Sequence, residues 1–472
     1  MGLSSDKEGV TKNDKDKYIA QLEKENAQLK EQVKELRACV HELERRLAMN
    51  SQNSSKPPST DAPDKKPKQG TRKKRRKKKG AQKGHKPHVR ELVPKEQVTH
   101  FVNLVPKQCT CGCDELEVCD EPAIRFQTFD LPPIKPEVNE YVQHMRKCKK
   151  CGTIVYLPLS DDIKRNVFGP GVLSVVSILT GMLNTSRRKA REVMNEVFCI
   201  PMSLGGLSNC EARITAALET PYDEVVDYVQ QQARAHADES SWRRGNRIKG
   251  WVWTLCCTTA AVFMIHASRG QKAARKLLGN FCGILNTDRW NGYWFYQYLR
   301  QICWAHLKRD FKAISESKGR LGKIGKELHA LARKILKLRR RVRDGTLQWK
   351  TFQSRMISLK ADVERLLEKG ATYEGALGGK CRDILKYRAY LWTFVDDLNV
   401  DPTNNAAEQI IRQAVLWRKT SFGTQSQRGA RYVERMLTVC ATCRLQSRSI
   451  IVYMRNACHS YLNNSPAPSL TP

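Results

Sequence analysis

Apolar residues recur every seven positions near the start of the chain. Leucine fills one heptad position four times, and a mostly β-branched series fills the other. The leucines are Leu22, Leu29, Leu36 and Leu43, and the second series is Ile19, Asn26, Val33, Val40 and Leu47. This combination favours a parallel two-stranded coiled coil, in which Asn26 would fix register and strand number. We predict a coiled coil over residues 18–48 that makes the protein a homodimer or higher oligomer; a single amphipathic helix packed on its own domain is the alternative.

Short apolar runs between residues 232 and 305 predict a sheet. The expected strands are 233–238, 250–258, 261–267, 283–286 and 301–305, with helices at 271–278 and 293–299. Three strands, helix, strand, helix and strand is the order of a ribonuclease H-like fold. We therefore predict a multidomain α/β protein whose mixed-sheet core spans residues 232–446, with a helical insertion at about 310–400. Long helices are expected at 324–342 and 352–367 in the insertion, and closing helices at 432–445 and 450–462, the last within a C-terminal helix and tail at 447–472.

Helical spacing also marks residues 161–225, which we predict to be a separate helical domain. Apolar residues from Leu173 to Leu183 give a first helix, the basic stretch 187–194 a second, and residues from Cys210 onward a third. A Gly-containing turn is expected at 201–209. This arrangement is compatible with helix-turn-helix DNA binding, and a plain three-helix bundle is the alternative.

The charge of the chain changes this picture, because 83 Lys and Arg stand against 48 Asp and Glu, a net charge of +35. Such a surplus favours a polyanionic partner, and the 40% hydrophobic content excludes a mere basic tail. Residues 49–90 are predicted to be a disordered basic linker that binds backbone phosphates, with a solubilising tail or a localisation signal as alternatives. Its unbroken cationic run is Arg72, Lys73, Lys74, Arg75, Arg76, Lys77, Lys78 and Lys79.

Cysteines cluster at two places between residues 91 and 160. Cys148 and Cys151 form a clean Cys-x-x-Cys, and an earlier group holds Cys109, Cys111 and Cys113. Two close groups with a glycine in each turn can surround one tetrahedral Zn²⁺. We predict a small zinc-binding domain with a structural ion, held by Cys148, Cys151 and two of the first three. Cys109 and Cys111 are taken as that pair, with Cys113 as the alternative ligand; a set of reduced, metal-free cysteines is the rival interpretation.

Three segments far apart each carry one acid among small and polar residues. Asp238 and Asp288 follow predicted strands, and Glu408 opens an amphipathic helix with Thr403 or Asn404 as the expected N-cap. If the first and fourth strands are neighbours, the two aspartates lie side by side and Glu408 can face both. Such a catalytic site suits two Mg²⁺ or Mn²⁺ ions and displacement at phosphorus. Glu239 is the rival of Asp238, and Asp401 is the rival of Glu408.

The basic, Gly-containing segment 417–426 follows Glu408. Its Arg418 and Lys419 suit contacts with DNA phosphates next to the acids. No run of 18 apolar residues is present, so no membrane span is expected, and the first residues lack the apolar core of a signal peptide. The mostly isolated cysteines, 17 in all, suit reduced thiols in a cytosolic protein.

Four segments resemble the bacterial transposases of the insertion-sequence sixty-six family, of the transposase C-like kind. They are 237–243 (Ala-Asp-Glu-Ser-Ser-Trp-Arg), 288–293 (Asp-Arg-Trp-Asn-Gly-Tyr), 303–306 (Cys-Trp-Ala-His) and 402–408 (Pro-Thr-Asn-Asn-Ala-Ala-Glu). The order of zipper, basic segment, cysteine cluster and catalytic body is similar too. The resemblance implies a DDE transposase with Asp238, Asp288 and Glu408 as its metal-binding triad. It also implies action on element-end DNA in the bacterial nucleoid, beside accessory proteins of the same element.

These expectations predict an enzyme that cuts DNA at element ends and transfers the released strand to target DNA. One alternative is a ribonuclease H-like nuclease or resolvase that cleaves without joining. Another is a zipper-dimerised DNA-binding regulator whose core is catalytically inactive.

Overall fold

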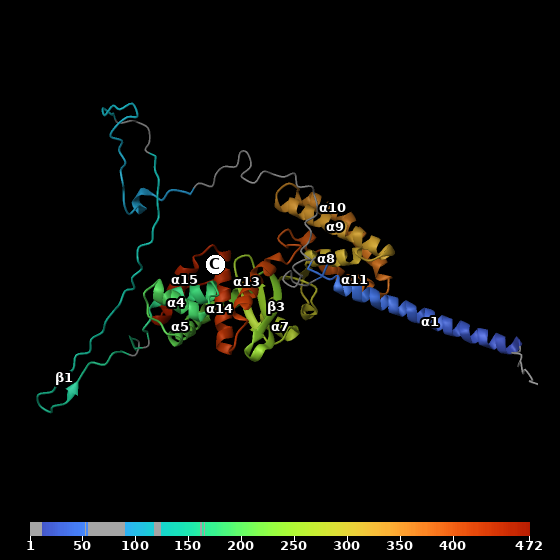
Figure 1. The fold of residues 1–472 in the computed structure, drawn as a ribbon, viewed down its shortest axis with the longest axis horizontal. Helices are drawn as coiled ribbons and strands as arrows, with labels where there is room; N and C mark the ends of the chain where they lie inside the picture. The colour runs from blue at the N-terminus through green and yellow to red at the C-terminus, as the bar shows by residue number, and fades with distance from the viewer. Residues whose placement is uncertain (1–11, 52, 55–89, 118–123, 161–162, 165) are drawn as a thin grey trace, which may run out of the picture. The chain divides into compact units, whose positions relative to one another are not determined.

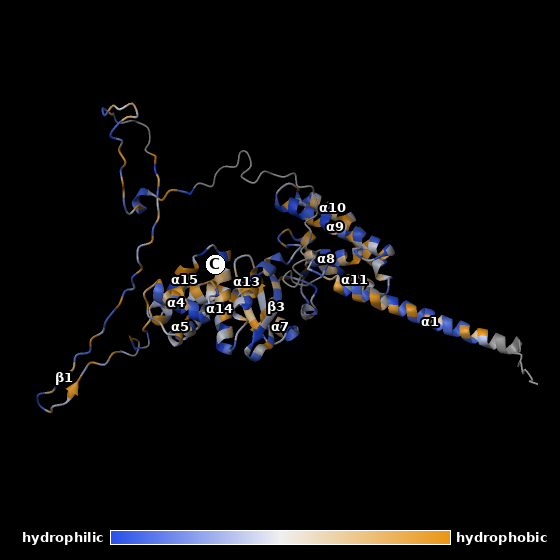
Figure 2. Cartoon of the chain, viewed as in Figure 1, coloured by the Kyte–Doolittle hydropathy of each residue, from blue (hydrophilic) through white to orange (hydrophobic). Residues whose placement is uncertain are grey.

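The computed structural model describes residues 12–51, 53–54, 90–117, 124–160, 163–164 and 166–472. The heptad region forms one continuous helix, α1 (Lys12–Leu47). Its heptad leucines are exposed in the single chain, Leu29 by 58% and Leu36 by 64%. Apolar and polar residues therefore alternate along an uncovered helix, as Figure 2 shows. The coiled coil itself stays a prediction.

Five strands form the central mixed sheet, in the order β5-β4-β3-β6-β7. The strands are β3 (Arg234–Arg244), β4 (Ile248–Cys256), β5 (Ala261–His266), β6 (Ile284–Thr287) and β7 (Arg300–Ile302). β4 runs antiparallel to β3 and β5, whereas β6 runs parallel to β3 and β7. All five strands lie where the sequence predicts them, and the first expected strand is therefore a neighbour of the fourth.

The helix expected at residues 293–299 is wrong. That segment holds only the end of a single turn, η6 (Asn291–Tyr293), and then runs to β7 without a helix. Aromatic spacing suggested a helix face, but Tyr293 and Tyr296 are buried while Trp294 and Tyr298 are exposed. The Tyr296 hydroxyl donates to the Gly283 carbonyl at 2.5 Å. Two boundaries also move. β3 continues to Arg244 because it forms a long hairpin with β4, and Trp304 opens helix α8 (Trp304–Ser315) instead of ending a strand.

Helix α14 (Gln427–Leu445) covers the free edge of the sheet at β5. Glu434, Thr438 and Thr442, spaced four apart on this helix, accept hydrogen bonds from the backbone amides of Ile265, Phe263 and Ala261 at 2.5, 3.0 and 3.2 Å. The helical repeat thus matches the alternate amides of the edge strand, which would otherwise be open to pairing with another chain. Burial raises the pKa of Glu434 to about 7.

Two further helices flank the strands. α7 (Gln271–Leu278), at its predicted place, contacts β4, and α13 (Asn405–Ser421) packs across β3 and β4.

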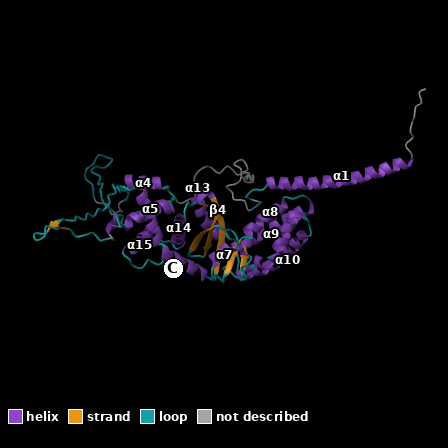
Figure 3. Cartoon of the chain, turned by 90° about the horizontal axis from the view of Figure 1, so that it is seen from below, coloured by secondary structure: helices purple, strands orange, loops and turns teal. Residues whose placement is uncertain are grey.

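The insertion is helical, as predicted, and forms its own apolar core. Its elements are α8, α9 (Gly319–Arg343), α10 (Trp349–Ala371), α11 (Gly375–Lys386), η7 (Arg388–Leu391) and α12 (Thr393–Asp396). Figures 1 and 3 show α8, α9 and α10 grouped on one side of the sheet. Arg339, from the cationic stretch of α9, is buried and donates to the carbonyl of Leu398 at 2.5 Å. That cation therefore holds a loop instead of facing a partner.

The helices before the sheet pack with the last helix of the chain. They are α3 (Pro170–Val176), η4 (Ser177–Met182), α4 (Arg187–Glu196), α5 (Leu204–Ala217), α6 (Glu219–Gln230) and α15 (Ile450–Leu462). α15 lies against α3 and α5. The expected turn at 201–209 is wrong beyond Ser203, because the Ser203 hydroxyl accepts the Gly206 amide at 2.9 Å and starts α5 there.

The described residues between 90 and 160 have little regular structure. It holds η3 (Lys95–Gln97) and the short hairpin of β1 (Arg146–Lys147) and β2 (Ile154–Val155). None of the helices in the described ranges is long and apolar enough to cross a membrane.

Candidate active site

Two aspartates follow neighbouring parallel strands of the sheet. β3 and β6 pair with His236 opposite Asn286, so Asp238 and Asp288, each two residues further along, come to the same end of the sheet. Both side chains are partly buried. Burial raises the pKa of Asp238 well above its usual range, and the charges of Glu239 and Asp288 add to the rise. The pairing of the strands thus brings the two predicted acids together.

Glu408 joins them from the first turn of α13. Its amide donates to the Asn404 carbonyl at 3.1 Å, and its charge also contributes to the raised pKa of Asp238. The side chain is 35% exposed, yet its Oε1 is buried and has no hydrogen-bond partner among the described residues. The charges of Asp288 and Glu408 therefore both act on Asp238, although the chain supplies the three acids from distant segments.

The two rival acids are placed differently. Glu239 is buried and forms an ion pair with Arg269 at 2.9 Å, and it accepts a hydrogen bond from the Tyr293 hydroxyl at 3.0 Å. Burial and the charge of Asp288 raise its pKa to about 7, against the lowering effect of Arg269. Because alternate residues of a strand point to opposite faces, Glu239 leaves β3 on the face opposite to Asp238. Asp401 is exposed. Its backbone carbonyl, and not its carboxylate, accepts a hydrogen bond from the side-chain amide of Asn286 at 2.8 Å.

Asn404 ties the start of α13 to the sheet. It stands at the N-cap position, as expected, but its side chain does not cap the helix. Instead its Nδ2 donates to the Ala237 carbonyl at 2.8 Å, and its Oδ1 lies 3.1 Å from His236 Nδ1. Its backbone amide donates to the Cys303 sulfur at 3.1 Å. One buried side chain thus fixes Glu408, four residues on, relative to the strand that carries Asp238.

The turn that carries Asp288 is anchored to the helical insertion. Asp288 Oδ1 accepts the backbone amide of Trp290 at 2.8 Å, which closes the turn. The neighbouring Arg289 forms ion pairs with Asp310 of α8, at 2.5 Å, and with Asp383 of α11. Although burial opposes it, the cations around Asp310 hold the pKa of that carboxyl below its usual range. The position of Asp288 therefore depends on helices outside the sheet.

A second group of potential metal ligands lies beside Glu408. The ligand atoms of Cys303, His306 and Glu408 all lie within 4.8 Å of one another, the one such trio in the described ranges. Burial raises the pKa of the Cys303 thiol to about 12, so this sulfur stays protonated at neutral pH. It also accepts the Asn404 amide, as noted above. A protonated, hydrogen-bonded thiol is a poor metal ligand, because metals bind the thiolate.

The residues predicted to contact DNA differ in what surrounds them. Arg418 turns back onto β3, where its guanidinium donates to the hydroxyl and carbonyl of Ser241, and Lys419 is exposed. The segment after them is also folded onto β3, since the Thr424 amide donates to the Arg243 carbonyl at 2.9 Å. The run at residues 72–79 lies outside the described residues.

Each cysteine group forms a tight turn of its own. The Gly112 amide donates to the Cys109 carbonyl at 2.9 Å, and Gly112 has a φ of +92°. In the second group the Gly152 amide donates to the Cys148 carbonyl, also at 2.9 Å, and Gly152 has a φ of +72°. Positive φ values explain the glycine in each group, because other residues rarely adopt them. The two groups belong to different compact units of the chain.

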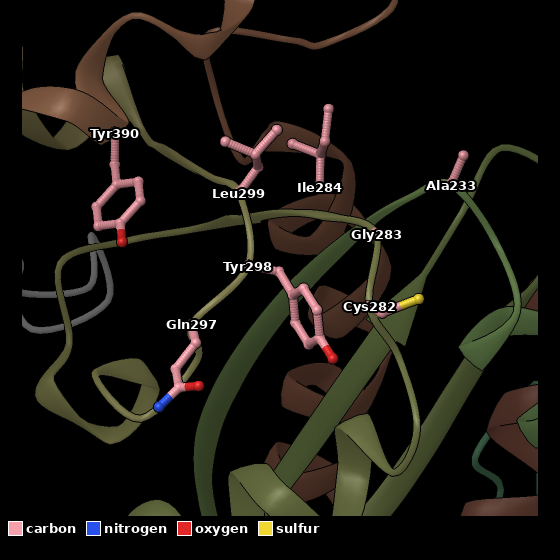
Figure 4. Close-up of a pocket in the computed structure, with 8 residues that line it drawn as sticks. All are labelled: Ala233, Cys282, Gly283, Ile284, Gln297, Tyr298, Leu299 and Tyr390. Atoms are coloured by element: carbon pink, nitrogen blue, oxygen red, sulfur yellow. The ribbon is translucent and has the colours of Figure 1, made fainter.

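A shallow groove of about 530 Å³ lies at the opposite end of the parallel strands (Figure 4). It is lined by Ala233, just before β3, by Ile284 at the start of β6, and by Tyr298, Leu299 and Tyr390. No acid lines it, so this groove is separate from the carboxylate cluster.

Sequence reasoning did not predict the tertiary contacts made around the acids. Asn404, Arg289 and His306 all lie inside the segments that carry the resemblance, at 402–408, 288–293 and 303–306. That these polar residues fall within three short, unusual motifs was the one feature of the sequence that could have drawn attention to them. Their partners, however, lie far away in the sequence, so no local pattern could identify them.

Comparison with known proteins gives consistent matches along the chain. The profile described as the Transposase IS66 family matches residues 167–432, and that of the zinc-finger binding domain of transposase IS66 matches residues 106–152. A family of unknown function, DUF6444, matches residues 8–91. Among relatives from Sinorhizobium fredii (strain NBRC 101917 / NGR234), the uncharacterized protein y4hP is 25% identical over 382 residues, covering 72% of this chain and 68% of its own length. The uncharacterized protein y4jD is 19% identical over 378 residues, 70% of each chain.

We predict that Asp238→Asn stabilises the sheet in buffer free of divalent cations. The pKa of Asp238 is raised in the folded protein above the value of about 3.9 expected in the unfolded chain. The wild type therefore loses stability as the pH rises from about 3.9 through the folded-state pKa. The loss is about 1.4 kcal/mol for each unit by which the folded-state pKa exceeds the unfolded one. Asparagine removes the charge but can still accept the Glu239 amide. Urea unfolding followed by tryptophan fluorescence should show the variant gaining most at pH 8 and least near pH 4. An equal gain in the free energy of unfolding at all pH values would show that the charge of Asp238 is not the cause. The same gain in Asp401→Asn would show this too.

Asn404→Ala should destabilise the sheet by about 1–3 kcal/mol, because it leaves the buried Ala237 carbonyl and His236 without their partner. The matched control is Asn405→Ala, at an exposed position next to it, which should change stability by no more than about 0.5 kcal/mol. Chemical denaturation of both variants tests this, and equal effects would show that Asn404 does not hold the two segments together.

Proposed function

We propose that this chain, which belongs to the IS66 family of transposases, binds the ends of an insertion element, cleaves them and joins the released 3′-OH to target DNA. The observation that carries the proposal is the pairing of β3 with β6, which brings Asp238 and Asp288 to the same end of the sheet. The pKa of Asp238 is raised there by burial and by the charges of Glu239, Asp288 and Glu408. The family profile spans all three acids.

The sheet supports a ribonuclease H-like core for this activity. In chain order its strands lie 3-2-1-4-5, the second antiparallel and the fourth and fifth parallel to the first. The acids come from the first strand, from the turn after the fourth and from a helix that crosses the sheet. The insertion between Asp288 and Glu408 is then an addition that leaves the core topology unchanged.

The donor set fits divalent cations that prefer oxygen ligands, Mg²⁺ or Mn²⁺. The raised pKa of Asp238, to which Asp288 and Glu408 contribute, and the unpartnered Oε1 of Glu408 are features that a cation would stabilise. Two such ions, when bound, would activate the attacking oxygen and neutralise charge on the leaving oxygen. Asp238, Asp288 and Glu408 would hold them.

The chain's own groups hold these carboxylates in place before any ligand binds. The backbone amide of Glu239 donates to Asp238 Oδ1 at 2.9 Å, and that of Trp290 donates to Asp288 Oδ1 at 2.8 Å.

In the first reaction water attacks the end phosphodiester and the P–O bond to the 3′ oxygen breaks, releasing a 3′-OH. In the second that 3′-OH attacks a target phosphodiester, and a target 3′ oxygen leaves. Both displacements use the same three carboxylates.

DNA contacts are proposed at the exposed Lys419, near the site, with Arg418 beside it, and along the basic run at residues 72–79. The zipper is proposed to pair two or more chains. Its support is the exposed heptad leucines of α1, which pairing would bury. Accessory proteins of the same element are proposed as further partners, on the family resemblance alone.

The zinc-finger match at residues 106–152 supports a structural Zn²⁺. We assign Cys148, Cys151 and two of Cys109, Cys111 and Cys113 as its ligands. The glycine-closed turn in each group supports the assignment, because such turns direct successive thiolates toward one point. An all-cysteine shell is closed, so this ion would take no part in the reaction.

Asp288→Asn should abolish cleavage and strand transfer but leave end binding intact, because it removes one carboxylate without touching the cationic surfaces. The assay incubates purified full-length protein with labelled DNA carrying the ends of its own element and Mg²⁺, with accessory proteins added in a parallel reaction. Asp401→Asn is the matched control, since that exposed acid lies near Glu408 but uses only its backbone carbonyl.

Joined products from the wild type and Asp401→Asn alone would support the proposal. Joining by Asp288→Asn would reject the triad. Cleavage without joining would point to a nuclease, and tight binding without any product, even with accessory proteins, to an inactive regulator.

Metal analysis tests the zinc assignment. We expect about one zinc per chain in the wild type and its loss in Cys148→Ser, because three remaining thiolates bind zinc more weakly than four. Cys282→Ser, at another exposed cysteine, should keep the metal. Single serine variants at residues 109, 111 and 113 will identify the other two ligands, and full zinc retention in Cys148→Ser would reject the site.

A further inference from the structure

His306 and Glu408 lie against each other with unsatisfied polar atoms. His306 stands in the first turn of α8, and its Nδ1 is 3.6 Å from Glu408 Oε1. Both atoms are buried, and neither has a hydrogen-bond partner among the described residues. Buried polar atoms without partners are rare in folded proteins and call for a physical explanation.

Arg309 determines which nitrogen of His306 carries the proton. Its Nη2 lies 3.1 Å from His306 Nε2. A guanidinium can only donate hydrogen bonds, so Nε2 must accept, and the proton of the neutral imidazole is on Nδ1. The Nδ1–H group therefore faces Glu408 Oε1, and a contraction of a few tenths of an ångström would make a normal hydrogen bond. The same guanidinium lies 3.9 Å from Glu408 Oε1.

This arrangement argues against His306 as a metal ligand. Metals bind the unprotonated nitrogen of a neutral imidazole, and here that nitrogen is occupied by Arg309. The third member of the trio, Cys303, is a protonated thiol that accepts the Asn404 amide. His306 thus has a donor for Glu408 and no free acceptor for a cation.

We propose that His306, oriented by Arg309, is a positioning residue that fixes the carboxylate of Glu408. It would hold Oε1 and so orient the rest of the carboxylate, whose side chain is 35% exposed although Oε1 is buried. A carboxylate on a flexible glutamate otherwise rotates about its last torsion, which is broad. The inference rests on the proposed function only in assuming that Glu408 binds a cation.

Manganese binding by the full-length, zinc-loaded protein without DNA tests the role. Residues that hydrogen-bond a metal ligand typically change metal affinity 10–100-fold, so His306→Ala should weaken Mn²⁺ binding by that factor. In His306→Asn the amide nitrogen can replace Nδ1 as a donor, and we expect binding within about 3-fold of the wild type by comparison with that range. His329→Ala, on α9, is the control for removing a histidine from the insertion and should bind normally.

A second measurement does not depend on the cation. Nitrogen NMR of histidine-labelled, Mn²⁺-free protein, with His306→Asn to assign the signal, should show the Nδ1–H tautomer for His306. The Nε2–H tautomer would overturn the proposal, as would unchanged Mn²⁺ affinity in His306→Ala or a loss of zinc from that variant, since zinc loss would make His306 a ligand.

The outcomes separate this proposal from the proposed function. If Asp288→Asn still joins DNA while His306→Ala weakens Mn²⁺ binding and the Nδ1–H tautomer is seen, the positioning role stands and the triad falls. If Asp288→Asn is inactive but His306→Ala binds Mn²⁺ normally, the triad stands and the positioning role falls. A wild type that binds no Mn²⁺ at that site rejects both.

Discussion

The hydrogen bonds of one buried amide determine whether the acids meet. Asn404 has 1% of its surface exposed, and its side chain joins the helix that carries Glu408 to the strand that carries Asp238. The residues between these segments include most of the sheet and the whole insertion. Without this bridge, the start of α13 would keep its other links, such as the Trp304 amide bound to the Pro402 carbonyl and the Asn286 side chain bound to the Asp401 carbonyl, each at 2.8 Å. Strand pairing supplies the other half of the constraint, since it brings Asp238 and Asp288 to the same end of the sheet.

Gathering like charges opposes folding, and the surroundings of the acids show how the chain tolerates it. Each aspartate accepts a backbone amide, and an imidazole N–H faces the glutamate. Most cations near the site are bound to neighbouring carboxylates, with Arg269 on Glu239 and Arg289 on Asp310. Arg309 is the exception, because its guanidinium lies 3.9 Å from Glu408 Oε1. Burial and the neighbouring carboxylates together raise the pKa of Asp238.

The places of the strands were predicted from the sequence, whereas the roles of the three acids stay a prediction. Apolar runs such as 261–267 have the composition of buried strands, so their places followed from local pattern. The helix predicted at 293–299 is wrong because its aromatic spacing also fits a non-helical segment that buries some of its rings, such as Tyr296. The side chain of Asn404 could not be placed, because an N-cap asparagine normally bonds its own helix and here a distant strand competes. The contacts of Arg289 and His306 could not be predicted for the same reason, because their partners lie far away in the sequence.

The position of Glu408 late in the chain has a consequence during synthesis. The ribosome makes the cationic segment at 72–79, the cysteine groups and both aspartates before it reaches residues 404–408. A growing chain, or one that stops within the insertion, lacks both the bridging amide and the third carboxylate. Such a chain can pair β3 with β6 and bring the two aspartates together, but it cannot complete the group of three acids.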